Sequence, residues 1–388
     1  MAEASLHFAA WRASEALARL TPPWQTLADG LPALHANQTP QWVEAALAHL
    51  LDRPDSLWLI TAHQDAALVA IWPLEQRGQQ LRGLWQEHLY VCDLTARPDA
   101  GAQLWPLMWH WLQHDAGLDW RQFLLPRLSD DAVLAHWLRQ MPVARMLSTP
   151  RPGSAWIDCQ RSYAELLRDA SANLRSKLSR AGKRAAAHGQ LSGQTCTEPQ
   201  ALRDALQQFV QIENSGWKGR DGGAVAQRAE LVAFYEQLVQ SLGARGQFEI
   251  DLLCLGGRAI AVTLWLRTGG RLHLQKTAYL ESVAELSPGN LLLAYSLQRA
   301  CLDPQLLGLD FMTRCPWADG WRPQLRPIHS VTLYRDSWRG RAAFELTRAS
   351  RRFKAAARPL WLRVKLASSA LRSRVRRAIA RAARHPSG

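Results

Sequence analysis

Residues 248–280 contain three apolar runs joined by two glycine pairs, Gly256-Gly257 and Gly269-Gly270. Adjacent glycines accept the positive φ angles that tight hairpin turns require. This pattern predicts three consecutive antiparallel strands. A helix is expected next, beginning in the turn at 287–290, and a further buried strand follows at 306–312. A hairpin sheet that continues into a helix and another strand is a mixed α/β sheet.

The first 147 residues predict a similar order of elements. A helix begins after Thr39, a hairpin turns at residues 63–65, and a strand, a helix, a strand and a helix follow. A chain of 388 residues is too long for one ordinary core, which also favours two domains. We therefore predict an α/β chain with the following divisions: a domain at 1–147, a linker at 148–155 with two prolines, a domain at 156–338 and a basic tail at 339–388.

The positive charge is concentrated at the C-terminus. The whole chain carries +14, and the last fifty residues hold fifteen of its 47 lysines and arginines but one acid, Glu345. The remainder is close to neutral, which argues against a nucleic-acid-binding body. The six cysteines form no C-x-x-C pair and no secretory signal is visible, so we expect a cytoplasmic protein.

The tail has helical periodicity. After Pro359, apolar residues recur on one predicted helical face and basic residues occupy the others, which indicates a basic amphipathic helix over 359–384. Such a helix can lie on an anionic membrane surface, here the inner face of the membrane. The alternatives are a solvated or disordered tail and an RNA-binding tail. The apolar residues are Leu360, Val364, Leu371, Val375 and Ile379.

Several segments in a fixed order resemble a known family over about residues 156–335. The chain is similar to GNAT-superfamily acetyltransferases of the branch associated with cellulose and exopolysaccharide synthesis (CelD-like), which is related to Fem-type peptidyltransferases. The resemblance implies two tandem GNAT-like domains, the first degenerate, each a mostly antiparallel sheet flanked by helices. The segments that carry it are LRSKLSRAGKR, IENSGWKGRDG, LLCLGGRAIAVTLWLR, HLQKTAYLESVAELSPGNLLL and LDFMTRCPWADGW.

The resemblance also implies a reaction. An acyl group would move from acyl-CoA, such as acetyl-CoA, to an amine by direct attack and without a metal; the acceptor would be a small molecule such as an amino sugar or a polysaccharide precursor. Two other functions remain open. One is a Fem-like transferase that uses aminoacyl-tRNA, the one case in which we expect a nucleic-acid partner. The other is a catalytically inactive, partner-binding GNAT-like module.

The acyl-donor site is expected at the turn before the helix at 288–302. Unpaired N–H groups and the dipole at a helix N-terminus favour an anion such as a pyrophosphate. Glycine lets the backbone approach the ligand closely. The alternative is an ordinary Pro-Gly helix start with a serine N-cap. The residues of this predicted site are Ser287, Pro288, Gly289, Asn290 and Leu291.

Glu213, Trp217 and Lys218 occupy the segment in which the family places residues of the acceptor cleft. A carboxylate partly buried beside an indole would have a raised pKa and could act as a base. The alternative interpretation makes Glu213 a solvated helix residue and Trp217 a core anchor. Lys276 and Tyr279 are three residues apart, so on a regular strand they lie on opposite faces.

The resemblance favours Tyr279 as a proton donor to the leaving thiolate, with Lys276 as a substrate contact; the alternative for Tyr279 is strand-end packing. Asp310 and Phe311 end a predicted strand, where Asp310 could act as a base that orients the amine, or only cap the next turn. After this pair the chain departs from the family. The family commonly has a glycine soon after this pair and then a Tyr-Lys pair, whereas residues 312–321 contain no lysine and have their glycine only at Gly320.

Other chemistries have less support in the sequence. His110 and His114 are one helical turn apart, a spacing that can bind metal. They lie in a tryptophan-rich helix with no third ligand nearby in sequence, so we expect a half-buried helix face. No G-x-S-x-G, G-x-x-x-x-G-K or strand-linked G-x-G-x-x-G motif occurs.

Overall fold

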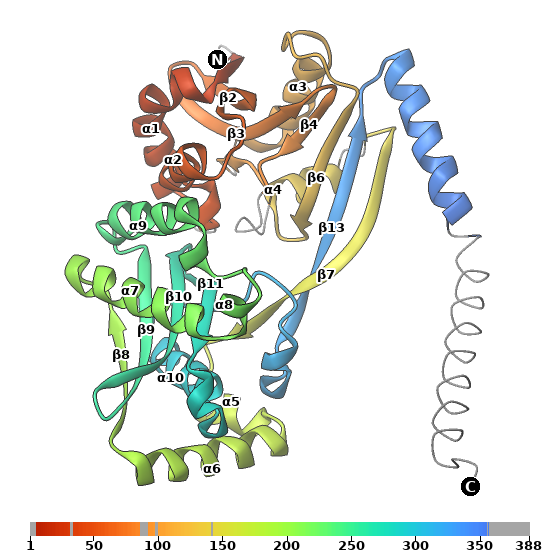
Figure 1. Cartoon of the computed structure of the whole chain (residues 1–388). Coiled ribbons are helices and arrows are strands. Elements are labelled where there is room, and N and C mark those ends of the chain that lie inside the picture. The colour runs from red at the N-terminus through yellow and green to blue at the C-terminus, as the bar shows by residue number, and fades with distance from the viewer. Residues whose placement is uncertain are drawn as a thin grey trace, which may run out of the picture.

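The structure is a computed structural model that describes residues 5–31, 34–85, 92–97, 100–140, 143–354 and 356 (Figure 1). Within these residues, thirteen strands form one sheet. The fold is mixed α/β, as predicted. The strand order is β1-β2-β3-β4-β6-β13-β7-β12-β11-β10-β9-β8, with β5 paired to β3.

The strand bounds are β1 Leu6–Arg12, β2 Leu57–Gln64, β3 Ala67–Arg77, β4 Gln80–Gly83, β5 Thr95–Ala96, β6 Gln122–Ser129, β7 Met146–Asp158, β8 Leu191–Cys196, β9 Phe248–Leu255, β10 Arg258–Thr268, β11 Arg271–Tyr279, β12 Gly308–Asp310 and β13 Gln324–Tyr334. The helix bounds are α1 Ala13–Asp29, α2 Pro40–His49, α3 Gly101–His114, α4 Val133–Gln140, α5 Tyr163–Asp169, α6 Ala172–His188, α7 Pro199–Ser215, α8 Trp217–Arg220, α9 Ala229–Gly243 and α10 Pro288–Leu302.

The two halves of the chain share this sheet. β13, from the end of the second half, pairs with β6 of the first half on one side and with β7 on the other. The expected linker at 148–155 is therefore wrong, because those residues lie inside β7. β12 pairs with β7 only at residues 156–158. On that side of β7, no described strand lies beside Pro150 and Pro152, so the N–H groups that prolines lack are not required there for pairing.

The halves also share a hydrophobic core. One cluster of buried side chains includes α1 and α2 from the first half and α7, α9, β9 and β10 from the second. At its centre Trp42 meets Phe234 edge-on, with ring centroids 5.1 Å apart. In Figure 1, α2 and α9 lie side by side where the halves meet. The junction is thus packed like a domain interior, so the halves are held in one arrangement.

Several local predictions are confirmed. The two glycine pairs form the turns between β9, β10 and β11, and all four glycines have positive φ. Residues 163–188 form two helices, α5 and α6, because the chain is extended at Ala170 and Ser171 caps α6. β1, α1 and β8 were not predicted. Pro22 and Pro23 lie inside α1, where the alanine, leucine and tryptophan repeat still gives a buried face.

The C-terminal tail is described only in part. Residues 338–354 are helical. Phe344 packs edge-on against Tyr334 of β13, with ring centroids 5.4 Å apart. The predicted amphipathic helix at 359–384 lies outside the described residues. None of the helices in the described part of the chain has the length and apolar character needed to cross a membrane.

Candidate active site

A cavity of about 510 Å³ lies in the second half of the chain and gathers most of the predicted site residues. Its walls come from α6, α7, the α7–α8 turn, β11, the start of α10 and the segment after β12. The predicted residues that line it are Glu213, Trp217, Lys218, Tyr279, Ser287, Pro288, Gly289 and Asn290. Leu291, Lys276, Asp310 and Phe311 do not line it.

The turn predicted to bind the acyl donor has fewer unpaired backbone N–H groups than expected. Ser287 has a left-handed φ of 52° and gives α10 no side-chain cap. Its carbonyl accepts the N–H of Asn290 at 3.0 Å and that of Leu291 at 3.2 Å. Pro288 has no N–H, so the Gly289 N–H is the backbone donor of this turn without an acceptor in the described structure. The N–H groups of Asn290 and Leu291 are therefore used within the chain, and Gly289 is the residue of the predicted turn whose N–H remains available to a ligand.

The alternative interpretation, a solvated Glu213 and a core Trp217, is the reverse of what the structure shows. Glu213 is buried, with 3% of its surface exposed, whereas Trp217 is 58% exposed. Glu213 Oε1 accepts from Lys218 Nζ at 2.7 Å, and Oε2 accepts the Val225 N–H at 2.9 Å. The carboxylate therefore faces the cavity as half of an ion pair, and the indole forms part of the cavity wall.

Glu281 was not predicted from the sequence, but it holds the turn that carries Trp217. Its Oε1 accepts the Trp217 N–H at 2.8 Å, and its Oε2 contacts Arg220 Nη2 at 2.7 Å. These hydrogen bonds, that from Arg220 first, lower the pKa of Glu281. In the same turn Gly219 passes so close to the Asn214 carbonyl that a Cβ would collide with it. The exposed turn is thus fixed over the cavity.

Tyr279 and Lys276 lie on opposite faces of β11. Tyr279 is opposite Ala261, whose side chain packs in the cluster that contains Leu292 of α10. Lys276 is opposite Leu264, which belongs to the core beneath α7. Tyr279 is half exposed, and its ring lies 3.7 Å from the point where a Cβ on Gly289 would stand. Tyr279 and the donor turn therefore form one corner of the cavity.

Two further wall residues, Lys177 and Trp317, come from segments that carried the resemblance but were not themselves predicted as site residues. Lys177 extends from the basic helix α6 and supplies a cation. Trp317 is about half exposed and meets the buried ring of Phe311 edge-on, with centroids 5.6 Å apart. Phe311, predicted to bind substrate, instead supports Trp317 from behind. The basic character of α6 was the sequence signal that could have identified Lys177. The exposure of Trp317 is visible only in the structure.

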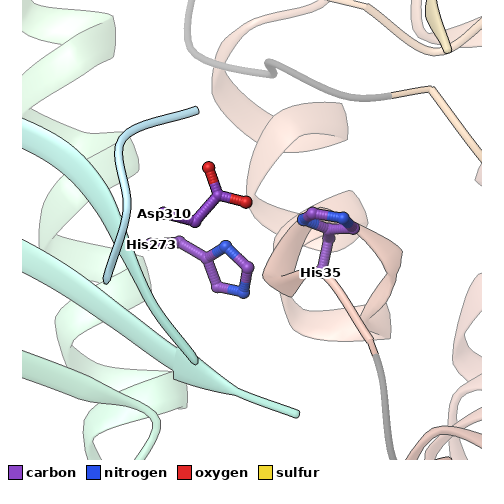
Figure 2. Close-up of side chains that lie close together, drawn as sticks. All are labelled: His35, His273 and Asp310. Atoms are coloured by element: carbon purple, nitrogen blue, oxygen red, sulfur yellow. The ribbon is translucent and has the colours of Figure 1, made fainter. Parts of the chain in front are cut away.

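Asp310 differs most from its predicted role. It ends β12 as expected, but only 3% of its surface is exposed, and Ser154 of β7 and Arg326 of β13 lie beside its carboxylate. Its Oδ1 accepts from Ser154 Oγ at 2.5 Å and from the Met312 N–H at 2.8 Å. The second bond is the turn cap that the alternative interpretation described. The carboxylate lies beside His35 and His273 instead of facing the cavity (Figure 2).

Comparisons with known proteins agree with this geometry. Residues 172–319, which supply the whole cavity wall, match the family described as acetyltransferase (GNAT) domain. No curated protein sequence matches the chain.

Solved structures resemble the fold at low sequence identity. FemX aligns with a TM-score of 0.55 at 11% identity, over 80% of this chain and 95% of its own. The C-terminal DUF2156 domain of a candidate lysylphosphatidylglycerol synthetase from Agrobacterium fabrum aligns with a TM-score of 0.53 at 11% identity, over 86% and 96%. A protein of unknown function from Bacteroides thetaiotaomicron gives 0.53 at 10% identity, over 82% and 97%. Residues 172–319 therefore match a GNAT-type acetyltransferase domain, and they lie in a chain whose two α/β halves share one sheet.

Proposed function

We propose that this protein is an N-acyltransferase that moves an acyl group from acyl-CoA, acetyl-CoA in the simplest case, to an amine. One observation carries the proposal. A single cavity in the GNAT-type domain contains the start of α10, the hydroxyl-bearing Tyr279 and the Glu213–Lys218 pair. An anion-binding turn, a proton donor and a carboxylate are the groups that acyl transfer from a thioester to an amine requires.

The reaction would proceed by direct attack. The amine nitrogen bonds to the thioester carbonyl carbon, the C–S bond breaks, and the electron pair leaves with the CoA sulfur. Glu213 takes the proton that the amine loses, and Tyr279 donates one to the departing thiolate. The Gly289 N–H and Lys177 contact the phosphates of the donor. Asp310 has no part in this scheme because it does not line the cavity.

We further propose an amino sugar or polysaccharide precursor as the acceptor. Trp217 and Trp317 expose indole rings in the cavity wall, and flat apolar rings of this kind can pack against the face of a sugar. The resemblance to the CelD-like branch supports the same class of acceptor. A location in the cytoplasm, beside the inner face of the membrane, would bring the enzyme to lipid-linked sugar intermediates.

The test is thiol release from a series of CoA thioesters, measured with and without amino-sugar acceptors. We expect CoA release that depends on the acceptor and a new amide detected by mass spectrometry. Thermal shifts with thioesters of increasing chain length would define the acyl group. If the protein neither binds CoA nor turns over a thioester with any amine, the proposal is contradicted, and a catalytically inactive partner-binding module is favoured.

A second candidate is a Fem-like transferase that uses aminoacyl-tRNA. The observation in its favour is the shared two-half architecture, since FemX aligns over 80% of this chain. The basic tail would then contact RNA phosphates, and binding would weaken steeply with salt. Transfer from aminoacyl-tRNA in the absence of CoA, combined with a salt-sensitive RNA shift, would select this function over the first.

A further inference from the structure

We propose that His35, His273 and Asp310 bind one divalent transition-metal ion, with Zn²⁺ the expected ion, at the junction of the two halves of the chain. One donor atom from each residue lies within 4.8 Å of the others. Figure 2 shows the carboxylate and the two imidazole rings gathered around one space, with His35 arriving from the first half and the other two from the second. Sequence analysis did not predict this metal site, because the donors come from segments distant in the chain.

Buried ring nitrogens without partners are the first support for this site. His273 has no exposed surface, and neither its Nδ1 nor its Nε2 has a hydrogen-bond partner among the described residues. The Nδ1 of His35 is in the same state. A buried polar atom without a partner costs roughly 1–3 kcal/mol, so two adjacent rings in this state require a compensating ligand. A metal ion can accept the lone pair of one nitrogen on each ring.

The fold places the three donors without a flexible segment. His273 and Asp310 are directly opposite each other as the last pair of the parallel strands β11 and β12. His35 precedes a short 3-10 helix at Ala36–Gln38. Gln38 fixes this loop, because its side chain accepts the His35 N–H at 2.9 Å and donates to the Leu94 carbonyl at 2.7 Å. The donor set is thus built on a sheet and an anchored turn.

Asp310 also has the outer contacts that metal-binding carboxylates usually have. The hydroxyl of Ser154 and the N–H of Met312 both donate to its Oδ1. This leaves Oδ2 as the oxygen directed away from those donors, and we assign Oδ2 as the ligand. The Ser154 hydroxyl is then a positioning group that orients the carboxylate.

Two arginines compete with the metal for negative charge. Asp131 Oδ2 contacts Arg271 at 2.9 Å and Arg326 at 3.4 Å. Arg326 Nη1 also lies 3.9 Å from Asp310 Oδ2. The two carboxylates thus lie beside two guanidinium groups. A bound divalent ion would draw Asp310 away from Arg326, while Arg326 would keep its contact with Asp131. Removal of the Arg326 charge should therefore strengthen metal binding.

The donor set selects the class of ion. Two imidazole nitrogens and one carboxylate oxygen suit Zn²⁺ and its first-row neighbours, whereas Mg²⁺ and Ca²⁺ prefer oxygen ligands. Zinc bonds of about 2.0–2.1 Å place tetrahedral ligands roughly 3.4 Å apart. The donors, at most 4.8 Å apart, need to move inward by about 1 Å or slightly more, which ring rotation at the two histidines can supply.

The test uses untagged, full-length protein that has been treated with chelator and then titrated with Zn²⁺ by calorimetry. Co²⁺ absorption spectra provide a second readout of nitrogen and oxygen coordination. We expect one Zn²⁺ per chain, with no comparable binding of Mg²⁺. His35→Gln and His273→Gln should each weaken Zn²⁺ binding about a hundredfold or more, and Ser154→Ala about tenfold. Arg326→Met should bind Zn²⁺ more tightly than the wild type.

The matched control is the double variant His110→Gln, His114→Gln. It removes two histidines that are also close, with ring centroids 4.6 Å apart, but are exposed and have no third ligand among the described residues. Its Zn²⁺ stoichiometry and affinity should equal those of the wild type. The proposal is overturned if the wild type binds no Zn²⁺ or Co²⁺, or if His35→Gln, checked for folding by circular dichroism, binds Zn²⁺ as tightly as the wild type.

Discussion

The Nζ of Lys218 lies 2.7 Å from Oε1 of the buried Glu213, so the carboxylate that faces the cavity is already paired with a cation. The other oxygen accepts the Val225 N–H. A base in this setting works beside a neighbouring ammonium group instead of in an apolar pocket. The pair gives the proposed reaction a carboxylate whose position is fixed before the substrate enters.

Glu213→Gln should lower kcat for thioester-dependent amide formation by about 10²–10⁴, the usual contribution of a well-placed base. The glutamine carbonyl can still accept the Val225 N–H, so the cavity wall is retained. Steady-state kinetics and a thermal melt of the same preparation measure the two effects separately. Glu236→Gln, an exposed change on α9, is the matched control. Full activity of the Glu213 variant would remove it from the mechanism.

Gly289→Val should weaken CoA binding by about tenfold or more, because its branched side chain would stand between the Gly289 N–H and the phosphates. The Gly289 φ is not positive, so valine fits the backbone, and a Cβ meets Tyr279 at an ordinary 3.7 Å. Calorimetry with CoA is the measurement. Gly182→Val, at a helix position with open space around it, should bind CoA normally. Equal CoA affinity of the two variants would place the pyrophosphate elsewhere.

Glu281 should make the order of the Trp217 turn depend on pH. The pKa of its carboxyl is depressed in the folded protein, chiefly by the hydrogen bond from Arg220. The ionised anchor is therefore fully present above the unfolded pKa of about 4.3, and it is lost as the pH falls through the lower folded value. Amide exchange at Trp217, corrected for intrinsic rates, should accelerate below about pH 4. In Glu281→Ala, which removes the acceptor, the Trp217 amide should exchange rapidly at every pH. Protection equal to that of the wild type at pH 7 would contradict this.

Gly193→Ala should destabilise the protein by about 1–3 kcal/mol, because overpacking displaces well-packed neighbours. A Cβ on Gly193 of β8 would come within 2.2 Å of the Tyr295 ring on α10. Gly182→Ala, inside α6, should instead stabilise by about 0.5–1 kcal/mol. Denaturant unfolding of both variants gives the comparison. Tyr295→Leu should relieve most of the Gly193→Ala cost, and an additive double mutant would argue against this contact.

The tail should bind anionic membranes. We propose that residues 359–384 hold the protein on the surface, and each basic residue near an anionic bilayer contributes about 1 kcal/mol. The comparison is a chain that ends at Lys354, because it keeps Phe344 against Tyr334. Full-length protein should sediment with anionic vesicles at low salt, and the shortened chain should not. Equal sedimentation would refute the tail's role, and tight, salt-sensitive RNA binding would favour the tRNA-dependent alternative.

The sequence by itself determined the local structure. Gly256-Gly257 and Gly269-Gly270 specify hairpins because few other residues accept their φ angles. The strand–turn–helix order around Gly289 placed the donor turn, since strand and helix periodicities differ over short windows. The family resemblance includes motifs at the α7–α8 turn and at the start of α10, and these motifs contain most of the predicted residues that line the cavity.

The tertiary structure decided what depends on distant segments. β7 could be recognised as a strand only with β13 beside it, because two prolines in an isolated sequence predict a linker. Asp310 ended a strand as predicted, but the residues beside its buried carboxylate, Ser154 and Arg326, come from β7 and β13. His35 meets His273 only because α1, α2, α7 and α9 pack in one core. Such contacts follow from the summed burial of many side chains, which no short stretch of sequence contains.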